Sequence, residues 1–406
     1  MQVHTAAIQA LRDPFEIRRR CAQLYQFVQH HDSRYFDLRM EQLPAVVDYV
    51  QTEIEKNYPK GDIPYHSRWR HFDCGNVDRV SPLRESLSKE NMKMQRLQLC
   101  ELAVLSVLLD AGAGSQWRYI DPHSQRVFSR SEGLALASLY GVQQGFFSSQ
   151  RDPGIVDAHG LQTLQLETLA QIFQVSAENP LVGLSNRLAL LQRLGDVVAQ
   201  YKGSLDVHRR LGAVVADCFA DGTSITASQI FAHWLAVFSP IWPSGYYLGP
   251  VNLGDVGEHP CVTGIPGTEG LVPFHKLSQW LTYSLLEPFE WSGISVTGIE
   301  ALTGLPEYRN GGLFLDFGVM QPKQADFWQV RHIPTSPCMV EWRALTVCLL
   351  DEVGCAVRKA RGVTAEAFPL AKLLQGGTWS AGRRIAQEKR STGEPPLQIQ
   401  IEGTLF

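Results

Sequence analysis

Apolar residues recur every three to four positions along most of this chain, which is the spacing of one face of an α-helix. In 45–56, for example, Val46, Val47, Val50 and Ile54 fall on one such face. The stretch 92–109 is apolar nearly all round in its second half, which indicates a helix buried on every side. The pattern predicts helices over 45–56, 92–109, 160–173, 181–201, 205–219, 275–286 and 342–359.

Strand signals are few. Residues 397–401 alternate between apolar and polar types and end in the turn Glu402-Gly403, which predicts a short strand or hairpin arm near the C-terminus. The region 240–273 is rich in Gly and Pro, so we expect a long ordered loop with a functional role. Together these patterns predict one mainly α domain over 1–406, with a soft division near residue 155.

The segment 298–320 places several reactive side chains in a short stretch that resembles a helix–turn–helix. Pro306 and neighbouring glycines break the apolar pattern, so Glu307, Tyr308 and Arg309 should stand at an exposed helix start. A carboxylate beside a fixed cation suits general-base or cation-stabilising chemistry. A surface Glu–Arg pair near a helix cap is the alternative interpretation. Asp316 adds a second acid at the far end of the segment.

The composition narrows the classes of function. An apolar fraction of 44% and a charged fraction of 19% are typical of a folded globular protein. The net charge of −4 argues against nucleic acid as the main ligand. No long uncharged apolar run suggests a membrane span, so we expect a cytoplasmic protein. The eight cysteines form no CxxC pair and are best explained as free, mostly buried thiols, and we expect no metal or other cofactor.

Three further segments combine residues that can bind a ligand. The first, 65–79, mixes aromatic residues, which stack on sugars, with arginines, which bind phosphate; an amphipathic loop with local ion pairs is the alternative. In the second, 376–384, glycines and a threonine cap predict a helix start that can bind an anion, or simply a capped helix. The third, 267–276, brings a carboxylate, an imidazole and an amine to one helix start, where a lysine should meet an acid or a ligand. The candidate binding residues of these segments are Trp69, Arg70, His71, Phe72, Asp78 and Arg79, then Thr378 and Arg383, then Glu269, His275 and Lys276.

Several longer motifs carry a likeness to a known family. They are HSRWRHF, DAGAG followed by Trp117 and Tyr119, SRSEGLALAS, GTEGLVPFHKLSQWLTYSLLEPFEW, LTGLPEYRNGGLFLDFGV and GGTWSAGRRIA. Over almost the whole chain they resemble the uracil-catabolism protein four family of fungi and bacteria, long described as a domain of unknown function. The resemblance implies a role in the ring-opening route of uracil degradation. In that route uracil is phosphoribosylated, its ring is opened by a cyclohydrolase-like enzyme, and urea is eventually released.

A more distant similarity concerns FHKLSQWLTYSL and LTGLPEYRNGGLFLDFGV. Their order and spacing are similar to a segment of queuosine-salvage N-glycohydrolases, and the likeness implies a helical, DNA-glycosylase-like fold. On this similarity Lys276 matches a lysine, Tyr308 and Arg309 match a Tyr-Arg pair, and Glu307 falls on the acid that acts in cleavage. The chain departs from that pattern in having Glu instead of Asp at 307 and Asn310-Gly311-Gly312 instead of a Pro-Gln step.

The sequence therefore suggests an N-ribosyl hydrolase for a small, nucleotide-like substrate, without nucleic acid or membrane partners. Glu307 would activate water or stabilise an oxocarbenium-like transition state, and Arg309 would keep it ionised. Each remaining role has several candidates. Binding of a 5′-phosphate is assigned to Lys276, Arg70, Arg79 or Arg383, and packing on the sugar to Trp69, Phe72 or Tyr308. Protonation of the leaving nitrogen is assigned to Glu269 or Asp316.

Two alternatives remain from the sequence. One is an amidohydrolase that acts on the acyl side of the same compounds through a metal or a nucleophile such as Cys261. The other is a non-catalytic carrier of a labile intermediate. The oligomeric state has no signature in the sequence.

Overall fold

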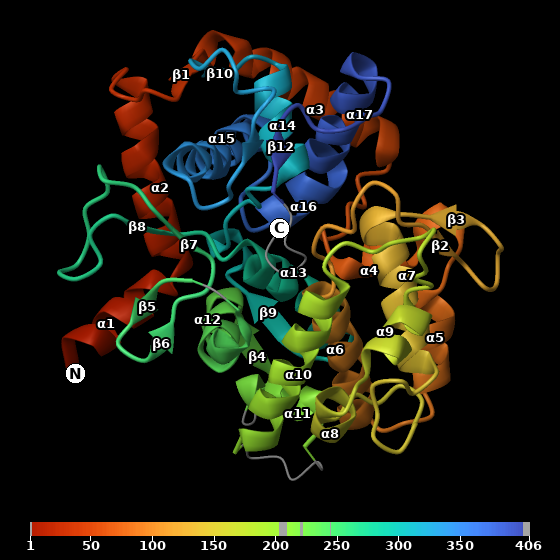
Figure 1. Cartoon of the computed structure of the whole chain (residues 1–406). Coiled ribbons are helices and arrows are strands. Elements are labelled where there is room, and N and C mark those ends of the chain that lie inside the picture. Colours follow the sequence, from red (N-terminus) through yellow and green to blue (C-terminus); the bar gives the residue numbers. More distant parts are fainter. Residues whose placement is uncertain (1, 203–208, 220–221, 244, 401–406) are drawn as a thin grey trace. The chain divides into compact units, whose positions relative to one another are not determined.

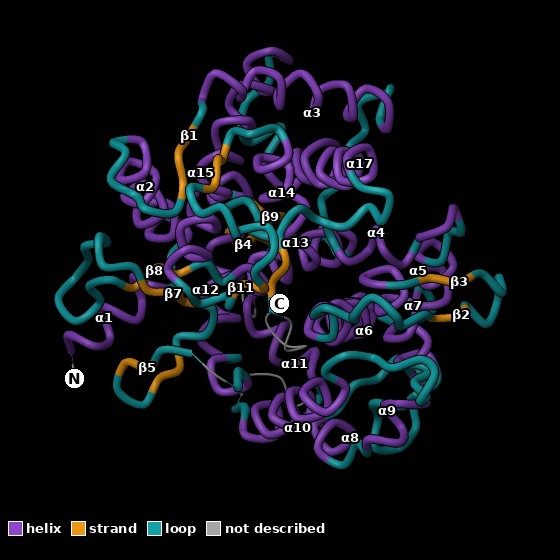
Figure 2. Tube along the Cα trace, turned by 45° about the horizontal axis from the view of Figure 1, so that its top comes forward, coloured by secondary structure: helices purple, strands orange, loops and turns teal. Residues whose placement is uncertain are grey.

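The chain is mainly α, as its apolar pattern predicts, with short paired strands between the helices (Figures 1 and 2). The computed structural model describes residues 2–202, 209–219, 222–243 and 245–400. They form two compact units, of which unit 1 comprises the described parts of Met1–His66, Gly245–Gln279 and Gly298–Gln400. Unit 2 comprises the described parts of Ser67–Ser244 and Trp280–Thr297, so residue 155 lies within it.

Unit 1 holds both ends of the described chain and most of the short strands. Its helices are α1 (Gln2–Leu11), α2 (Pro14–Gln29), η1 (Met40–Gln42), α3 (Leu43–Asn57), η5 (Ile299–Ala301), α14 (Tyr308–Asp316), α15 (Pro337–Arg361), α16 (Leu370–Leu373), the π-helical turn η6 (Leu374–Thr378) and α17 (Trp379–Lys389). Its strands are β1 (Phe36–Leu38), β5 (Tyr247–Leu248), β6 (Val251–Asn252), β7 (Val256–Glu258), β8 (Leu271–Pro273), β10 (Met320–Pro322), β11 (Arg331–His332) and β12 (Gln398–Ile399).

Helix α15 is the core element of unit 1. Pro337 occupies its first turn, where no backbone donor is lost, and Gly362 ends it in the left-handed conformation. Trp342, Leu345 and Leu349 are fully buried along one side. Helices α2, α3, α14 and α16 pack against α15 (Figure 1). The first turn of α14 is therefore set against the N-terminal half of a buried helix.

Unit 2 is built mainly from helices of moderate length. Its helices are α4 (Arg68–Phe72), η2 (Cys74–Asn76), α5 (Val80–Leu87), α6 (Met92–Leu108), α7 (Arg130–Gln143), α8 (Ala158–Gln162), α9 (Leu166–Ile172), α10 (Leu184–Gln200), α11 (Leu211–Ala216), η3 (Asp217–Phe219), α12 (Ala227–Val237) and η4 (Ser239–Ile241). Its strands are β2 (Tyr119–Ile120), β3 (Val127–Phe128), β4 (Ser224–Thr226) and β9 (Ser295–Thr297). Helix α13 (Lys276–Trp291) begins in unit 1 and continues in unit 2.

Helix α6 confirms the prediction of a buried helix, because every residue from Leu99 to Leu108 is buried. Glu101 lies among them with no exposed surface. Its carboxylate accepts two hydrogen bonds of 2.8 Å from the Arg210 guanidinium and one of 3.0 Å from the Gly212 N–H. A buried charge is tolerated only when it is paired in this way, so the pair fixes α11 against α6.

The strands form separate two-stranded sheets. These sheets occur throughout the described chain, not only near the C-terminus. The Gly- and Pro-rich region 240–273 contains two antiparallel pairs, β5–β6 and β7–β8. Strand β12, within the predicted strand 397–401, pairs in parallel with β11. The turn expected at Glu402-Gly403 lies outside the described residues.

Most predicted helices are confirmed in position, with two exceptions. The helix expected over 160–173 is two helices, α8 and α9, because the chain turns at Thr163–Gln165. There Gln165 has an extended backbone, with φ −102° and ψ 155°, and serves as the N-cap of α9. The helix expected at 205–219 begins outside the described residues, and its described part is α11 followed by η3.

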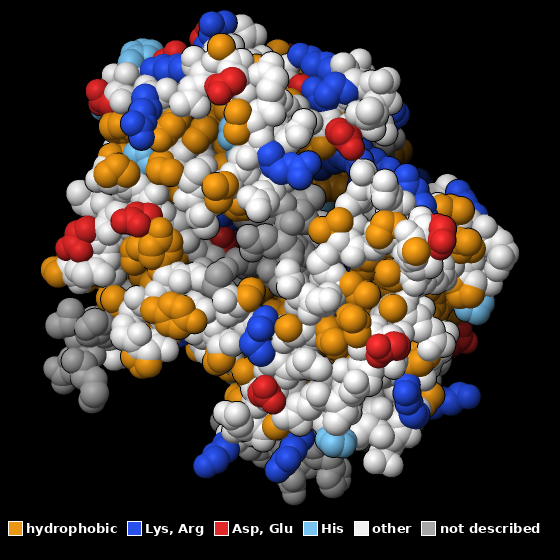
Figure 3. Space-filling model, viewed as in Figure 1, with side chains coloured by type: hydrophobic (Ala, Val, Ile, Leu, Met, Phe, Trp, Pro, Cys, Tyr) orange, Lys and Arg blue, Asp and Glu red, His pale blue; other side chains and the backbone are white. Residues whose placement is uncertain are grey.

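No helix among the described residues is long and apolar enough to cross a membrane. On the face shown in Figure 3, basic, acidic and apolar side chains are interspersed. All eight cysteines are free thiols: Cys21, Cys74, Cys100 and Cys338 are buried, while Cys355 is exposed, although it lies in an apolar helical pattern. The described residues contain no group of three or more His, Cys, Asp or Glu side chains arranged to hold a metal ion.

Candidate active site at the start of helix α14

Glu307 is the N-cap of α14, as the break in the apolar pattern predicts. Its backbone is extended, with φ −130° and ψ 176°. Its Oε1 accepts a hydrogen bond of 2.7 Å from the Asn310 N–H, and its Oε2 accepts one of 2.9 Å from the Arg309 N–H. A carboxylate in this position also interacts favourably with the helix dipole. The local sequence therefore fixes the orientation of this side chain, which remains partly exposed.

The surroundings of Glu307 change its acidity. Burial raises the pKa of this carboxyl above its ordinary value, and this effect exceeds the opposing effects of the two N–H donors and of the Lys276 and Arg309 charges. A carboxyl whose pKa is raised toward neutrality is better suited to exchange protons with a substrate or water. Glu307 is thus held rigidly, lies near two cations, and is easier to protonate than an exposed glutamate.

A buried ion pair positions Lys276, the first residue of α13. Asp255 accepts a hydrogen bond of 2.9 Å from the backbone N–H of Lys276. The Asp255 carboxylate also receives both terminal nitrogens of Arg343, at 2.8 and 2.6 Å. Although burial opposes its ionisation, the Arg343 charge and these hydrogen bonds bring the pKa of Asp255 to about 2. Asp255 therefore anchors the start of α13, and the Lys276 charge acts on the carboxyl of Glu307.

His275 precedes Lys276 in a strained backbone conformation. Its φ is 47°, a left-handed value that costs a residue other than glycine roughly 1–3 kcal/mol. The buried ring donates through Nε2 to the carbonyl of Leu11 at 2.9 Å. Burial lowers the pKa of His275 to about 4, so the ring is neutral at physiological pH. His275 was expected to bind substrate, but its Nε2 serves to hold the chain at the entry to α13.

Several buried polar atoms around α14 have no hydrogen-bond partner within the described chain. They are the Tyr308 hydroxyl, the Asn310 Oδ1, both amide atoms of Gln279, the Trp342 Nε1 and the Thr378 Oγ1. Leaving such an atom unpaired costs roughly 1–3 kcal/mol, so a set of them in one place calls for a partner such as water or a bound ligand.

These atoms belong to elements that meet near the first turn of α14. Gln279 lies one helical turn after Lys276, whose charge reaches Glu307. A Cβ added at Gly311 would lie 2.2 Å from the Trp342 ring, so this ring packs directly on α14. Thr378 lies one turn before Gly382, where an added Cβ would lie 2.1 Å from the carbonyl oxygen of Arg309. Glu307, Lys276 and this set of polar atoms form the candidate site.

Comparison with known proteins gives the family. Residues 10–406 match the family described as "Protein of unknown function (DUF1688)". The chain belongs to this family. Protein urg3 of Schizosaccharomyces pombe is 38% identical over 402 residues, which cover 96% of this chain and 97% of that protein. Uracil catabolism protein 4 of Lachancea kluyveri is 35% identical over 428 residues, with 96% and 97% covered.

The resemblance drawn from the motifs is thus confirmed for the family. The more distant likeness to queuosine-salvage enzymes, and the DNA-glycosylase-like fold that it implies, stay predictions.

In unit 2 of this DUF1688 protein, the aromatic residues of α4 are structural. Trp69 and Phe72 have no exposed surface, and the Trp69 Nε1 donates to the Ser284 carbonyl at 2.8 Å. Neither ring offers a face to a sugar, contrary to expectation. Arg70 donates to Glu287 at 2.7 Å, and the buried His71 ring lies 5.6 Å from that of Trp280. The expected sugar-binding segment is therefore part of the packing of unit 2.

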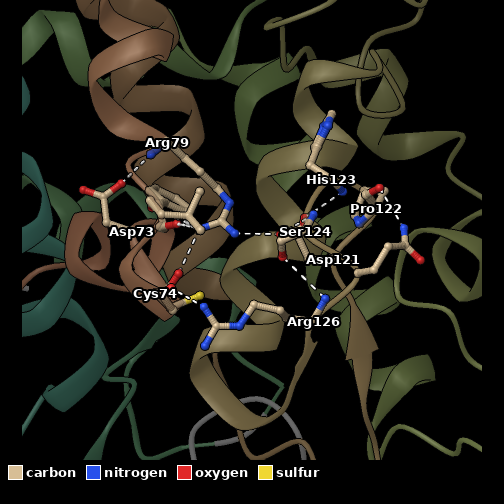
Figure 4. A network of polar contacts seen from close by, with 12 residues as sticks. Asp73, Cys74, Arg79, Asp121, Pro122, His123, Ser124 and Arg126 are labelled. Carbon is tan, nitrogen blue, oxygen red and sulfur yellow. Dashed lines mark hydrogen bonds and ion pairs between the residues drawn. The ribbon is translucent and has the colours of Figure 1, made fainter.

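Arg79 was expected to contact phosphate, but its guanidinium is committed to a network inside unit 2 (Figure 4). It donates to Asp121 at 2.7 Å, to the Tyr140 hydroxyl at 3.1 Å, and to three backbone carbonyls of the preceding turn. The Arg79 side chain is only 7% exposed, so its guanidinium is held in the packing of unit 2 and is not presented to a phosphate. Asp78 is exposed and accepts a hydrogen bond of 2.9 Å from the Ser81 N–H, so it stabilises the start of α5.

The two acids proposed for the leaving group are not placed beside Glu307. Asp316 is the last residue of α14, about 13 Å along the helix from Glu307 at a rise of 1.5 Å per residue. Paired glycosidase carboxylates lie roughly 5–9.5 Å apart. Both Asp316 oxygens are also held by Arg390, at 2.7 and 2.6 Å. Glu269 is exposed on the loop between β7 and β8, where it accepts a hydrogen bond of 2.8 Å from the Gly267 N–H.

The Gly-Gly-Thr run does not open a helix. Helix α16 continues through the π-helical turn η6 into α17, and Thr378 is helical with no capping hydrogen bond from its side chain. The anion site expected at a free helix N-terminus there is therefore wrong. Arg383 is exposed, with its guanidinium 5.8 Å from the Trp379 ring centre. Thr378 nonetheless belongs to the candidate site through its buried, unpaired hydroxyl.

Sequence reasoning missed the residues that build the rest of the site: Asp255, Gln279, Asn310, Trp342 and Arg343. An arginine within the apolar pattern of α15 was a usable sign of a buried partner. Asp255 lies in the Gly- and Pro-rich region 240–273, for which a functional role was expected. Gln279, Asn310 and Trp342 gave no sign, because their lack of partners is visible only in three dimensions.

Proposed function

We propose that this protein acts in uracil catabolism and hydrolyses the N-glycosidic bond of a phosphoribosylated urea or ring-opened pyrimidine nucleotide. The name of the relative from Lachancea kluyveri supports the first part. The observation that carries the second is the Glu307 carboxyl, held by two N–H groups and acted on by Lys276, in a site with unpaired buried polar atoms.

In the proposed reaction Glu307 activates a water molecule or stabilises the positive charge that develops on the ribose. Its two N–H donors fix the carboxyl direction, so little reorganisation is needed in the transition state. The cations Lys276 and Arg309 are the candidates for an anionic part of the substrate. They also favour the ionised form of Glu307, against the effect of burial.

The unpaired atoms suit a neutral polar leaving group. An ureido group has several N–H donors and one strong acceptor, and the site offers both kinds of partner. The amide of Gln279 can donate and accept, Asn310 offers an acceptor, and Trp342 a donor. Burial raises the pKa of Tyr308 further above neutrality, so its hydroxyl remains protonated and can donate to the leaving nitrogen.

The direct test is to incubate the purified protein with ribosylurea 5′-phosphate, and with UMP as control, and to follow ribose 5-phosphate and urea by mass spectrometry. We expect release from the ring-opened compound only. Glu307→Gln should lower kcat roughly 10²–10⁴-fold, the usual contribution of a general acid–base group, and leave substrate binding within a few fold. Glu269→Gln, the same change on an exposed loop, is the matched control and should retain activity.

The outcomes separate the assignments. Full activity of Glu307→Gln would show that another group performs the chemistry. No release from either compound would rule out N-glycoside cleavage of these substrates. Thermal stabilisation by ribosylurea 5′-phosphate without any product would favour a carrier of the intermediate.

A further inference from the structure

A second group of reactive side chains lies in unit 1, on residues that the candidate site does not use. Cys261 is a partly exposed thiol in the turn after β7. Its Sγ lies 3.0 Å from the Nδ1 of His259, two residues earlier. The other ring nitrogen of His259, Nε2, lies 3.1 Å from the Oε1 of Glu341 on α15. Cysteine, imidazole and carboxylate thus form a continuous chain.

The carboxylate end of this chain is fixed. Glu341 and His259 are 1% and 4% exposed, and the second Glu341 oxygen accepts a hydrogen bond of 2.5 Å from the Ser33 hydroxyl. The His259 N–H does not point straight at Oε1, so their contact is electrostatic rather than a linear hydrogen bond. The aromatic ring of Phe27 packs edge-on against the imidazole, with centroids 5.7 Å apart. These contacts leave the imidazole little freedom to rotate.

The arrangement decides which ring nitrogen is basic. The carboxylate of Glu341 favours a proton on Nε2, which leaves the lone pair of Nδ1 directed at Cys261. The backbone N–H of Cys261 also approaches Nδ1, at 3.4 Å, as expected for an acceptor nitrogen. Burial raises the pKa of the Cys261 thiol to about 11, so the resting form is a thiol that depends on a base to remove its proton.

We propose that Cys261 and His259 form a second catalytic site, which transfers the acyl group of a small amide, N-acyl urea or thioester to the Cys261 sulfur and then to water. His259 takes the thiol proton as Sγ attacks the carbonyl carbon, and passes it to the departing nitrogen or sulfur. Water then attacks the thioester, His259 takes a proton from it, and the proton returns to Sγ as the acid leaves. Glu341 is a positioning residue, because it touches only the imidazole.

A second cysteine of the same chain, Cys355, allows the effect of a neighbouring base on Cys261 to be separated from the effect of exposure. Cys355 is the exposed cysteine of α15, and among the described residues no hydrogen bond joins its thiol to an imidazole. If exposure alone made a thiol reactive toward acyl donors, Cys355 would react faster than the partly exposed Cys261. If a base is required, Cys261 reacts faster.

The experiment treats the full chain with p-nitrophenyl acetate, an activated acyl donor that contains no N-ribosyl bond. We expect a burst of nitrophenolate, a thioester located on Cys261 by peptide mass spectrometry, and slow turnover. Cys261→Ala abolishes the burst, and Cys355→Ala leaves it unchanged. His259→Gln slows acylation roughly 10²–10⁴-fold, as expected for loss of a general base.

Glu341→Gln should lower the acylation rate constant without lowering the burst amplitude, whereas a loss of folded protein would lower the amplitude. Hydrolysis of N-acetylurea, followed as release of urea and acetate, tests the nitrogen leaving group. The proposal is overturned if the label falls on Cys355, or if His259→Gln acylates as fast as the unchanged protein. Because the acyl donors carry no ribose, these results are independent of Glu307 and of N-glycoside cleavage.

Discussion

The buried pair of Asp255 and Arg343 should be a principal source of stability in unit 1, and Asp255→Asn tests this. Lowering the pKa of Asp255 from 3.8 to about 2 corresponds to about 2 kcal/mol of folding free energy. The variant also leaves the Arg343 side chain, only 3% exposed, without its charge partner. Breaking a buried pair from one side costs roughly 3–5 kcal/mol, so we expect destabilisation in that range at pH 7.

The pH dependence gives a second, independent readout. Because the folded-state pKa lies below the unfolded-state value, the contribution of Asp255 is fully present above about pH 4 and is lost as the pH falls toward 2. The difference in unfolding free energy between the protein and Asp255→Asn should therefore shrink between pH 4 and pH 2. Urea unfolding followed by tryptophan fluorescence at several pH values measures it.

Two control variants make the result specific. Glu269→Gln makes the same carboxyl-to-amide change on an exposed loop and should alter stability by less than about 0.5 kcal/mol. Adding Arg343→Met to Asp255→Asn removes the unpaired charge and should restore part of the lost stability. The reasoning is refuted if Asp255→Asn unfolds at the same urea concentration as the unchanged protein, or if the difference stays constant as the pH falls to 3.

Three further predictions concern packing and polar atoms. Gly382→Ala should destabilise unit 1 by more than about 2 kcal/mol in urea unfolding, because its Cβ would lie 2.1 Å from the Arg309 carbonyl oxygen and backbone must move. Thr378→Val removes a buried, unpaired hydroxyl, so it should raise the thermal midpoint of unfolding or leave it unchanged. The same variant should raise KM for ribosylurea 5′-phosphate. A clear loss of stability would mean that the hydroxyl has a partner in the fold. Asp121→Asn should destabilise unit 2 by roughly 3–5 kcal/mol, because it leaves Arg79 buried without its counter-charge, and unchanged urea unfolding would contradict this.

The helices were predictable because their signal is local. The apolar spacing of α3, α6, α10 and α15 is complete within each helix, and the structure reproduces these elements to within a few residues. The single helix expected over 160–173 was wrong, because Gln165 adopts an extended backbone and begins a separate helix, α9. Apolar periodicity alone does not reveal such a break.

The sequence predicted the site only where the position of a side chain depends on residues next to it in the sequence. Glu307 was expected at a helix start because Pro306 and the following pattern specify one, and its capping bonds confirm that position. Asp255 and Arg343 are 88 residues apart, so their pairing depends on the tertiary fold. The glycines before Thr378 suggested a helix start, but a Cβ at Gly377 would lie 2.6 Å from Val50. They allow close helix packing instead of a chain break.

The π-helical turn η6 holds one residue more than the regular helix on either side of it, which makes it the place where the C-terminal helices tolerate a deletion. Each residue of an α-helix turns the chain by about 100°, so deleting one residue at 379–381 would rotate the rest of α17 by about that angle. Gly382 would then leave the Arg309 carbonyl, and Arg384 would leave Glu53, which it now contacts at 2.7 Å. Deleting one residue within Leu374–Thr378 would instead let the wide turn close to a regular α-helical turn, and α17 would keep its orientation toward the candidate site.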